Sequence, residues 1–367
     1  MDNRIYDYWA ATLQDGYLGA LPDIVECAGG ARALYEMPED RLRLLPHITD
    51  KLADYIIDRR VDTSVIEKDY IKMSMKGICY VNHSDEVFPE KLRNIPGMPY
   101  GLFVRGSLPD KSRKAVAIVG ARQCSEYGRL MAEFLGSRLA KEGIDVISGM
   151  AWGIDGIAQS AALSAGGRSY AVLGCGVDIP YPAKNRSLYN SLCEDGNGII
   201  SEYAPGTKAI ARLFPPRNRI ISGLCDVLIV VEARHRSGTL ITADMAADQG
   251  KCVMVVPGRL TDTLSTGCLN LMAQGALPVT GIESVLEALD MGKQLEFSPV
   301  TLARDDIPED LKPVADVLTL EPQSIEVIAD KARISVDSAL IILTKLELAG
   351  SAREVWPGYF IKNATVS

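Results

Sequence analysis

Seven short apolar segments alternate with longer helical stretches between residues 111 and 290, and this alternation constrains the fold more than any other feature of the chain. The segments are mostly β-branched and occupy residues 115–119, 145–148, 170–173, 198–201, 226–231, 252–256 and 277–279. Strands that alternate with helices form a parallel sheet covered on both faces. The fold class is therefore α/β with a Rossmann-like sheet, and a ligand is expected at the carboxyl ends of the strands.

The regions on either side have different patterns. Residues 1–65 show apolar residues at helical spacing, interrupted at Gly29-Gly30 and at Pro46, which predicts a small helical module. This module is of the SAM or helix-hairpin-helix kind, or it is a helical cap without a ligand. Residues 66–290 form the sheet domain, 291–304 a linker, and 305–367 three helices followed by a two-stranded wing, which is a winged-helix pattern.

Composition excludes several classes of protein. No apolar run approaches the roughly 18 residues that a membrane span needs, and the N-terminus is too polar for a secretory signal. The eight cysteines show no C-x-x-C pairs and no neighbouring histidines, so neither a metal site nor a disulfide framework is indicated. We expect a cytoplasmic protein without membrane contact, metal or cofactor.

The net charge of −8 is distributed unevenly along the chain. Residues 1–110 carry 13 basic and 18 acidic side chains, and residues 305–367 carry 6 and 11. The central residues 111–290 carry 18 basic and 17 acidic side chains. An anionic ligand is therefore expected on the central domain, where local clustering can concentrate arginines.

The loop after the first central strand begins like a dinucleotide-binding turn but lacks its glycines. The fingerprint G-x-G-x-x-G would require glycine at two positions that Arg122 and Ser125 occupy after Gly120. Arg122 and Ser125 precede a helix whose first amides could hold a phosphate. The alternative is a plain strand-to-helix turn with a surface arginine.

The next strand runs into "SGMAWGIDGIAQSAAL", which is rich in glycine. Gly149, Gly153 and Gly156 allow the backbone to approach a ligand closely. Trp152 is either a core residue or a platform for stacking a base. Asp155 could cap the following helix or hold an arginine in place.

Two further loops carry cations or hydroxyls at a helix start. In "FPPRNR", Arg217, Asn218 and Arg219 lie in the first helical turn, where cations oppose the helix dipole unless an anion is shared. Salt bridges to Glu202 or Glu232 are the alternative explanation.

The fourth loop is "RHRSGT", where Ser237, Gly238 and Thr239 open a helix between flanking arginines. Hydroxyls and bare amides in that position form an anion site.

Neither a catalytic set nor a Walker A motif is found in the sequence. The residues at the strand ends can hold phosphates, pair with arginines and stack on bases. Such a set is suited to binding a phosphodiester chain without cutting it.

Several segments, in this order, resemble the DprA/Smf family of DNA-processing proteins of natural transformation. They are "VAIVGAR", "SGMAWGIDGIAQSAAL", "AVLGCGVDIPYPAKN", "ISEYAPGT", "FPPRNRIISGL", "VLIVVEARHRSGTLITA" and "GCLNLMAQGA", within about residues 78–290. The resemblance implies an extended Rossmann-like fold that binds and protects single-stranded DNA. It also implies a homodimer that helps to load the recombinase RecA, and no enzymatic activity.

The loop patterns and the same resemblance together give a set of DNA-binding residues. The candidates are Gly120, Arg122, Ser148, Gly149, Trp152, Gly153, Lys184, Phe214, Arg217, Asn218, Arg219, Ser237, Gly238 and Thr239. Two positions depart from the family pattern, because Trp152 stands where arginine is usual and Gln159 where histidine is usual. A tryptophan could compensate in part by stacking, which contributes about 1–3 kcal/mol per base.

Two other functions are considered. LOG-type phosphoribohydrolases resemble this chain around Gly238-Thr239, but Thr242 stands where their catalytic glutamate would be. The chain could also be an adaptor whose outer domains contact other proteins while the central pocket stays empty.

Overall fold

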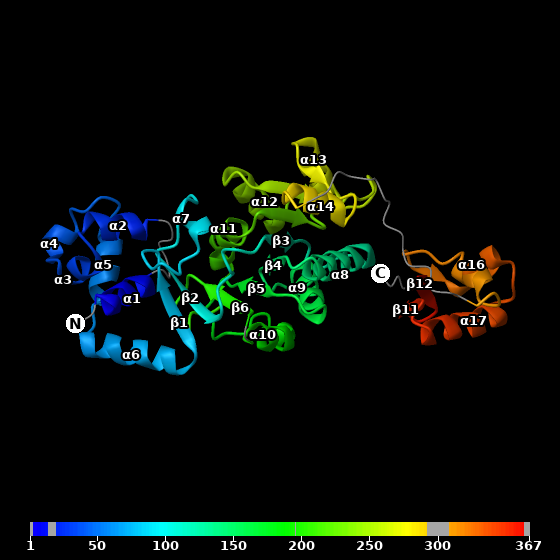
Figure 1. The fold of residues 1–367 in the computed structure, drawn as a ribbon, viewed down its shortest axis with the longest axis horizontal. Coiled ribbons are helices and arrows are strands. Elements are labelled where there is room, and N and C mark those ends of the chain that lie inside the picture. Colours follow the sequence, from blue (N-terminus) through cyan, green and yellow to red (C-terminus); the bar gives the residue numbers. More distant parts are fainter. Residues whose placement is uncertain (1–2, 14–19, 195, 292–307, 363–367) are drawn as a thin grey trace.

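The structure is a computed structural model that describes residues 3–13, 20–194, 196–291 and 308–362. Figure 1 shows helices of the N-terminal region at one end, a central sheet covered by helices, and a small C-terminal unit at the other end. None of the described helices combines the length and the apolar character that crossing a bilayer requires. The expected linker at 291–304 lies almost entirely outside the described residues.

The central sheet has nine strands in the order β1-β2-β6-β5-β4-β3-β7-β8-β9. Its strands are β1 (Ile78–Asn82), β2 (Gly101–Gly106), β3 (Ala115–Val119), β4 (Asp145–Ser148), β5 (Ser169–Val172), β6 (Gly198–Ser201), β7 (Val227–Val230), β8 (Cys252–Val255) and β9 (Leu277–Pro278). All seven expected strands are present, and each neighbouring pair from β6 to β9 is parallel. The predicted α/β class is confirmed.

At one edge, the sheet continues beyond the expected parallel strands with two antiparallel ones. Strand β2 pairs antiparallel with β6, and β1 pairs antiparallel with β2. The segment between β1 and β2 holds only the four-residue helix α7 (Glu90–Arg93). Strand–helix alternation is therefore absent there, and a search for that alternation does not detect these two strands.

Different helices cover the two faces of the sheet, and β3 is therefore buried on both sides. Val116 and Ile118 pack with one group of helices, whereas Ala117 and Val119 pack with the other. The first group is α8 (Glu126–Lys141), α9 (Ile154–Ser164) and α14 (Ile282–Ala288); the second is α11 (Phe214–Leu224), α12 (Gly238–Asp248) and α13 (Thr266–Ala273). Helix α10 (Arg186–Leu192) covers the sheet near β5 and β6. Successive side chains of a strand point to opposite faces of the sheet, and here both faces are covered. Every position of such a strand is therefore apolar.

The N-terminal helices are α1 (Arg4–Thr12), α2 (Leu21–Cys27), α3 (Ala31–Glu36), α4 (Glu39–Leu42), α5 (Asp50–Asp58) and α6 (Thr63–Met75). The break between α2 and α3 falls at Gly29-Gly30, as expected, and both glycines adopt positive φ. The SAM or helix-hairpin-helix assignment stays a prediction.

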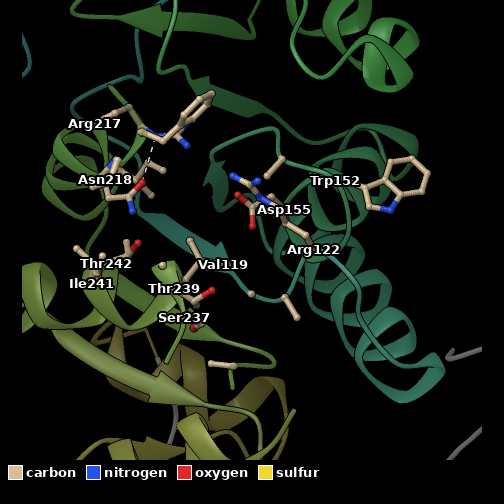
Figure 2. Close-up of a pocket in the computed structure, with 18 of the residues that line it drawn as sticks. Val119, Arg122, Trp152, Asp155, Arg217, Asn218, Ser237, Thr239, Ile241 and Thr242 are labelled. Carbon is tan, nitrogen blue, oxygen red and sulfur yellow. Dashed lines mark hydrogen bonds between the residues drawn. The ribbon is translucent and has the colours of Figure 1, made fainter. Parts of the chain in front are cut away.

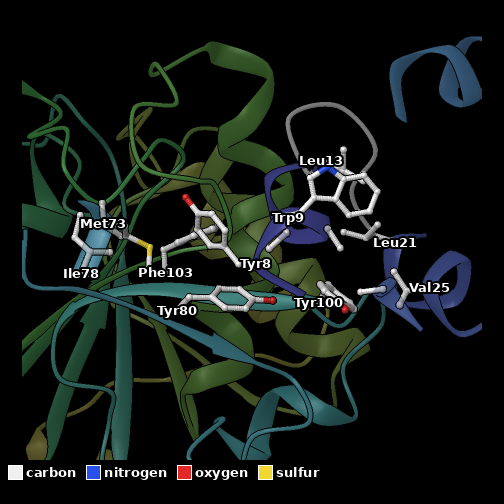
Figure 3. Close-up of a cluster of buried hydrophobic side chains, with 14 of the residues drawn as sticks. Tyr8, Trp9, Leu13, Leu21, Val25, Met73, Ile78, Tyr80, Tyr100 and Phe103 are labelled. Atoms are coloured by element: carbon white, nitrogen blue, oxygen red, sulfur yellow. The ribbon is translucent and has the colours of Figure 1, made fainter. Parts of the chain in front are cut away.

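These helices share a hydrophobic core with the antiparallel edge of the sheet. The ring of Tyr8 contacts that of Tyr70 at a centroid distance of 5.3 Å. It also contacts the rings of Tyr80 and Phe103, at 6.0 and 6.1 Å (Figure 3). The hydroxyl of Tyr100 donates to the Asp7 carboxylate at 2.5 Å. The contacts between α1 and strands β1 and β2 attach the N-terminal helices to the sheet.

The C-terminal unit has a hydrophobic core of its own. Its elements are α15 (Lys312–Ala315), β10 (Gln323–Ser324), α16 (Ile325–Ala332), α17 (Val336–Leu348), β11 (Ala352–Trp356) and β12 (Tyr359–Lys362). The three strands form a sheet in the order β10-β12-β11, with a hairpin that turns at Pro357-Gly358. The three expected helices and the two-stranded hairpin are present; their assignment as a winged helix stays a prediction.

Candidate nucleic-acid interface

The strand order of the sheet reverses at β3, and a cleft lies at this point. The chain proceeds from β3 to β4 on one side, whereas β7 pairs with the other side of β3. Loops that leave neighbouring strands in opposite directions leave a crevice between them. A cleft of about 780 Å³ lies there, lined by residues that follow β3, β4 and β7 and by the first turn of α11 (Figure 2).

Nine of the predicted site residues line this cleft. They are Gly120, Arg122, Trp152, Phe214, Arg217, Asn218, Ser237, Gly238 and Thr239. Residues from four separate loops are thus brought together, as expected from the position of those loops at strand ends.

The remaining five predicted residues do not line the cleft. Ser148 and Gly149 are buried beneath it, and the Ser148 hydroxyl donates to the Ile118 carbonyl at 2.6 Å. Gly153 faces the carbonyl oxygens of the β3–α8 loop. Lys184 and Arg219 make the contacts described below.

Arg217 lies in the cleft lining but is 5% exposed. Its guanidinium donates to the carbonyl oxygens of Val172 and Gly149, the latter at 3.2 Å, and to the Asn218 side chain at 3.2 Å. These bonds connect α11 to the ends of β4 and β5. Arg217 therefore holds the loops of the cleft in position, and most of its donors are already used.

Asp155 is buried close to Arg217. Its carboxylate accepts from the Gly149 amide at 3.1 Å. Burial raises the pKa of the Asp155 carboxyl, while the Arg217 charge and the hydrogen bonds act against this shift. Burial likewise lowers the pKa of the Arg217 guanidinium to about 10, with Asp155 opposing the change. Asp155 and Arg217 thus act on each other through their charges, while the carboxylate itself is held by the Gly149 amide.

Arg219 points away from the cleft into a buried ion pair. Its guanidinium donates to both carboxylate oxygens of Glu202, at 2.6 and 2.8 Å, and to the Gly97 carbonyl at 2.6 Å. The two side chains are 9% and 1% exposed. The salt-bridge alternative therefore holds for this residue, and we do not propose Arg219 as a DNA contact.

The N-terminus of α8 is already occupied by protein groups. The buried Glu232 carboxylate accepts from the Ser125 amide at 2.9 Å and from its hydroxyl at 2.5 Å. The Ser125 hydroxyl in turn accepts from the Gly128 amide at 3.0 Å. The expected phosphate site on these amides is therefore not available, and Arg122 and Gln123 are the exposed residues of this loop.

The N-terminus of α12 forms one wall of the cleft. Gly238 is exposed, and a Cβ added there would meet open space. The buried Ser237 hydroxyl has no hydrogen-bond partner within the described part of the chain. An N-terminus of this kind presents its amides to an anion.

Half-exposed aromatic rings lie elsewhere on the lining. Trp152 is 48% exposed and Tyr181 40% exposed, and Tyr181 packs against Phe214 with ring centroids 5.4 Å apart. The Lys184 ammonium lies 5.0 Å from the centre of the Trp152 ring. A cation over the tryptophan places positive charge beside a surface suited to stacking.

The second departure from the family pattern, Gln159, is a buried structural residue. Its carbonyl accepts from the Met150 amide at 3.0 Å, and its amide donates to Ser169 and Tyr170, each at 3.1 Å. Met150 adopts a positive φ of 52°. Gln159 thus supports an unusual backbone conformation two residues before Trp152.

Some lining residues were not singled out by the sequence. Tyr181, Ile241 and Ala211 line the cleft. Tyr181 and Ile241 are 40% and 39% exposed. Their position next to the motifs could have pointed to them. Their residue types could not, because an isolated apolar residue in a sequence is more often part of the core.

The comparisons with known proteins agree with this architecture. The model of the family "DNA recombination-mediator protein A" matches residues 79–290. DNA processing protein DprA of Streptococcus pneumoniae is 39% identical over 227 residues, which are 62% of this chain and 78% of that protein. Protein Smf of Escherichia coli K12 is 38% identical over 283 residues, 75% of each chain.

Solved structures are similar as well. The crystal structure of Streptococcus pneumoniae DprA has a TM-score of 0.67 at 32% identity and covers 78% of this chain and 98% of that one. A structure of DprA from Helicobacter pylori, described for its single-stranded DNA binding mode, has a TM-score of 0.51 at 28% identity. It covers 57% of this chain and 95% of that one. With a family match over more than half of its length, the chain belongs to the DNA recombination-mediator protein A family.

Proposed function

We propose that this chain binds single-stranded DNA in the cleft between the ends of β3 and β7. The observation that carries the proposal is the pairing of two surfaces in one cleft. One is the open N-terminus of α12 with Arg122 nearby, and the other is a set of half-exposed aromatic rings. The first suits phosphates and the second suits unpaired bases.

A single strand fits these surfaces better than a duplex. Stacking on Trp152 or Tyr181 requires a base whose face is free, and duplex bases are stacked on one another. The likeness to the Helicobacter pylori protein with a described single-stranded DNA binding mode supports the same choice.

The chemistry of the cleft supports binding rather than catalysis. Among the described residues that line it, Asp155 is the sole carboxylate, and it is held by the Gly149 amide beside Arg217. Thr242 occupies the place of the hydrolase glutamate and is buried. Incubation with nucleoside monophosphates should release no free base.

The family description supports a role in recombination. We include in the proposal that the chain, as a cytoplasmic homodimer, protects incoming strands during transformation and delivers them to the recombinase RecA. Recovery of RecA with the tagged protein, with and without single-stranded DNA, tests this step. Equal recovery in both cases would favour the adaptor alternative.

Titration with labelled oligonucleotides tests DNA binding directly. At equal length, a single strand should bind more tightly than its duplex form at about 0.05 and about 0.2 M salt. The affinity for the single strand should fall with a log–log slope of about −0.7 for each phosphate contacted. Equal affinity for both forms would contradict the proposal.

A further inference from the structure

A second groove borders the cleft on the side of helices α8 and α9. It has a volume of about 530 Å³. Its walls include Arg129 and Glu133 of α8 and Ser160 and Ser164 of α9. The two serines are exposed and lie one turn apart on the same face of the helix.

The groove and the cleft meet at three shared residues, Arg122, Gln123 and Trp152. In the view of Figure 2, Trp152 lies at the edge of the site, on the opposite side from Ile241 and Thr242. Its exposed indole thus lies where the cleft meets the groove. The Lys184 ammonium lies 5.0 Å from the centre of the ring.

The charges in the groove suit a polyanion. Arg122 is exposed, and it makes no ion pair or hydrogen bond with the residues that the structure describes. The guanidinium of Arg129 lies 3.7 Å from the carboxylates of Glu126 and Glu133, which is too far for a hydrogen bond. Neither carboxylate therefore orients the Arg129 donors, and a phosphate can compete for them.

We propose that a DNA strand held in the cleft turns over Trp152 and continues along the groove between α8 and α9. This inference rests on the proposed function and extends it, because it gives the bound strand a path and a longer footprint. Trp152 stacks a base at the turn, and Arg122 and Arg129 contact the phosphates on either side of it.

The test compares a short with a long oligothymidylate, of about 4 and about 16 nucleotides, on the full chain. In Ser160→Glu, a carboxylate enters the groove and repels phosphates there. The affinity for the long strand should fall about fivefold, while the affinity for the short strand, held in the cleft, stays within about twofold. Ser164→Glu should act in the same direction.

Two controls are matched to these variants. Ser74→Glu adds the same charge to an exposed position on α6, which lies with the N-terminal helices, apart from α8 and α9, and should change neither affinity (Figure 1). Glu133→Gln removes a carboxylate from the groove and should tighten binding of the long strand alone. Because Glu133 is 49% exposed, this variant is expected to fold as the parent does.

The outcomes separate this inference from the proposed function. If both serine variants bind the long strand as the parent does, the groove is not part of the path, while binding in the cleft stands. If they weaken both strands equally, the groove does not extend the footprint, and the inference also fails. If the parent binds neither strand, the proposed function itself is wrong.

Discussion

Arg122, Arg217 and Arg219 all follow strand ends in the sequence, but their side chains meet different surroundings. Arg122 is exposed at the cleft, Arg217 is buried in its wall, and Arg219 is paired with Glu202 beneath it. Burial and partners therefore decide which of these cations can meet a phosphate, and substitutions should distinguish their roles.

Arg122→Ala should weaken single-stranded DNA binding without affecting stability, because the side chain is exposed. Loss of one phosphate contact should reduce the log–log salt slope by about 0.7. Arg32→Ala is the matched control: it removes the same charge from an exposed ion pair on α3. A salt slope equal to the parent's would remove Arg122 from the site.

Arg219→Ala should destabilise the fold by about 3–5 kcal/mol, because Glu202 is left buried without its partner. Denaturant unfolding measures this change. The double variant Arg219→Met, Glu202→Leu should recover much of the loss, because it removes both charges. A single variant as stable as the parent would show that Arg219 is not structural.

At the scale of elements, the N-terminal helices and the antiparallel strands are held together by buried phenols. Burial raises the pKa of Tyr8 to about 12 and raises the pKa values of Tyr80 and Tyr100 above their usual range as well. All three residues lie in the shared core between α1 and the sheet. The attachment of these helices is therefore expected to depend on pH.

The sign of this dependence follows from the raised pKa values. The folded chain holds these protons more tightly than the unfolded chain, so the stabilisation is complete below about pH 10 and is lost as pH rises towards about 12. Each phenol contributes a slope of about 1.4 kcal/mol per pH unit within that window. The free energy of unfolding, measured with denaturant from about pH 9 to 11, should decline.

Tyr8→Phe isolates one of these groups. The ring contacts with Tyr70, Tyr80 and Phe103 are retained, but one titrating hydroxyl is lost. The decline of stability with pH should therefore be shallower than in the parent. Parallel curves would exclude Tyr8 as a contributor.

At the scale of the whole molecule, the acidic C-terminal unit has a core separate from the rest. The described ion pairs that join it to the central domain, Arg353 with Glu126 and Arg259 with Glu321, involve partly exposed side chains. Pairs of this kind contribute little. The unit is therefore expected to be dispensable for holding DNA in the cleft.

A chain ended after residue 291 should bind single-stranded DNA as tightly as the full chain, or slightly more tightly because acidic residues are removed. Circular dichroism shows whether the shortened chain is folded, and titration at matched salt measures its affinity. A loss of more than about tenfold would place part of the DNA site on residues 308–362.

The seven parallel strands and their order along the chain were predictable from the residues alone. A strand buried on both faces must be apolar throughout, and its ends must be marked by turns, as at Val116–Val119 and Gly120. The loops that carry the site were predictable for the same reason, since parallel strands present their carboxyl ends at one edge. These patterns are local, so they can be recognised from neighbouring residues alone.

The roles of individual side chains depended on contacts between distant segments. Glu202 is 17 residues from Arg219, Glu232 is 107 residues from Ser125, and Asp155 approaches Arg217 from another loop. Local spacing does not report such pairs, so the same residue types could equally have faced a ligand. Only the folded chain, by pairing Arg219 and Ser125 with carboxylates and leaving Arg122 and Trp152 exposed, separates the groups that support the cleft from those that can touch DNA.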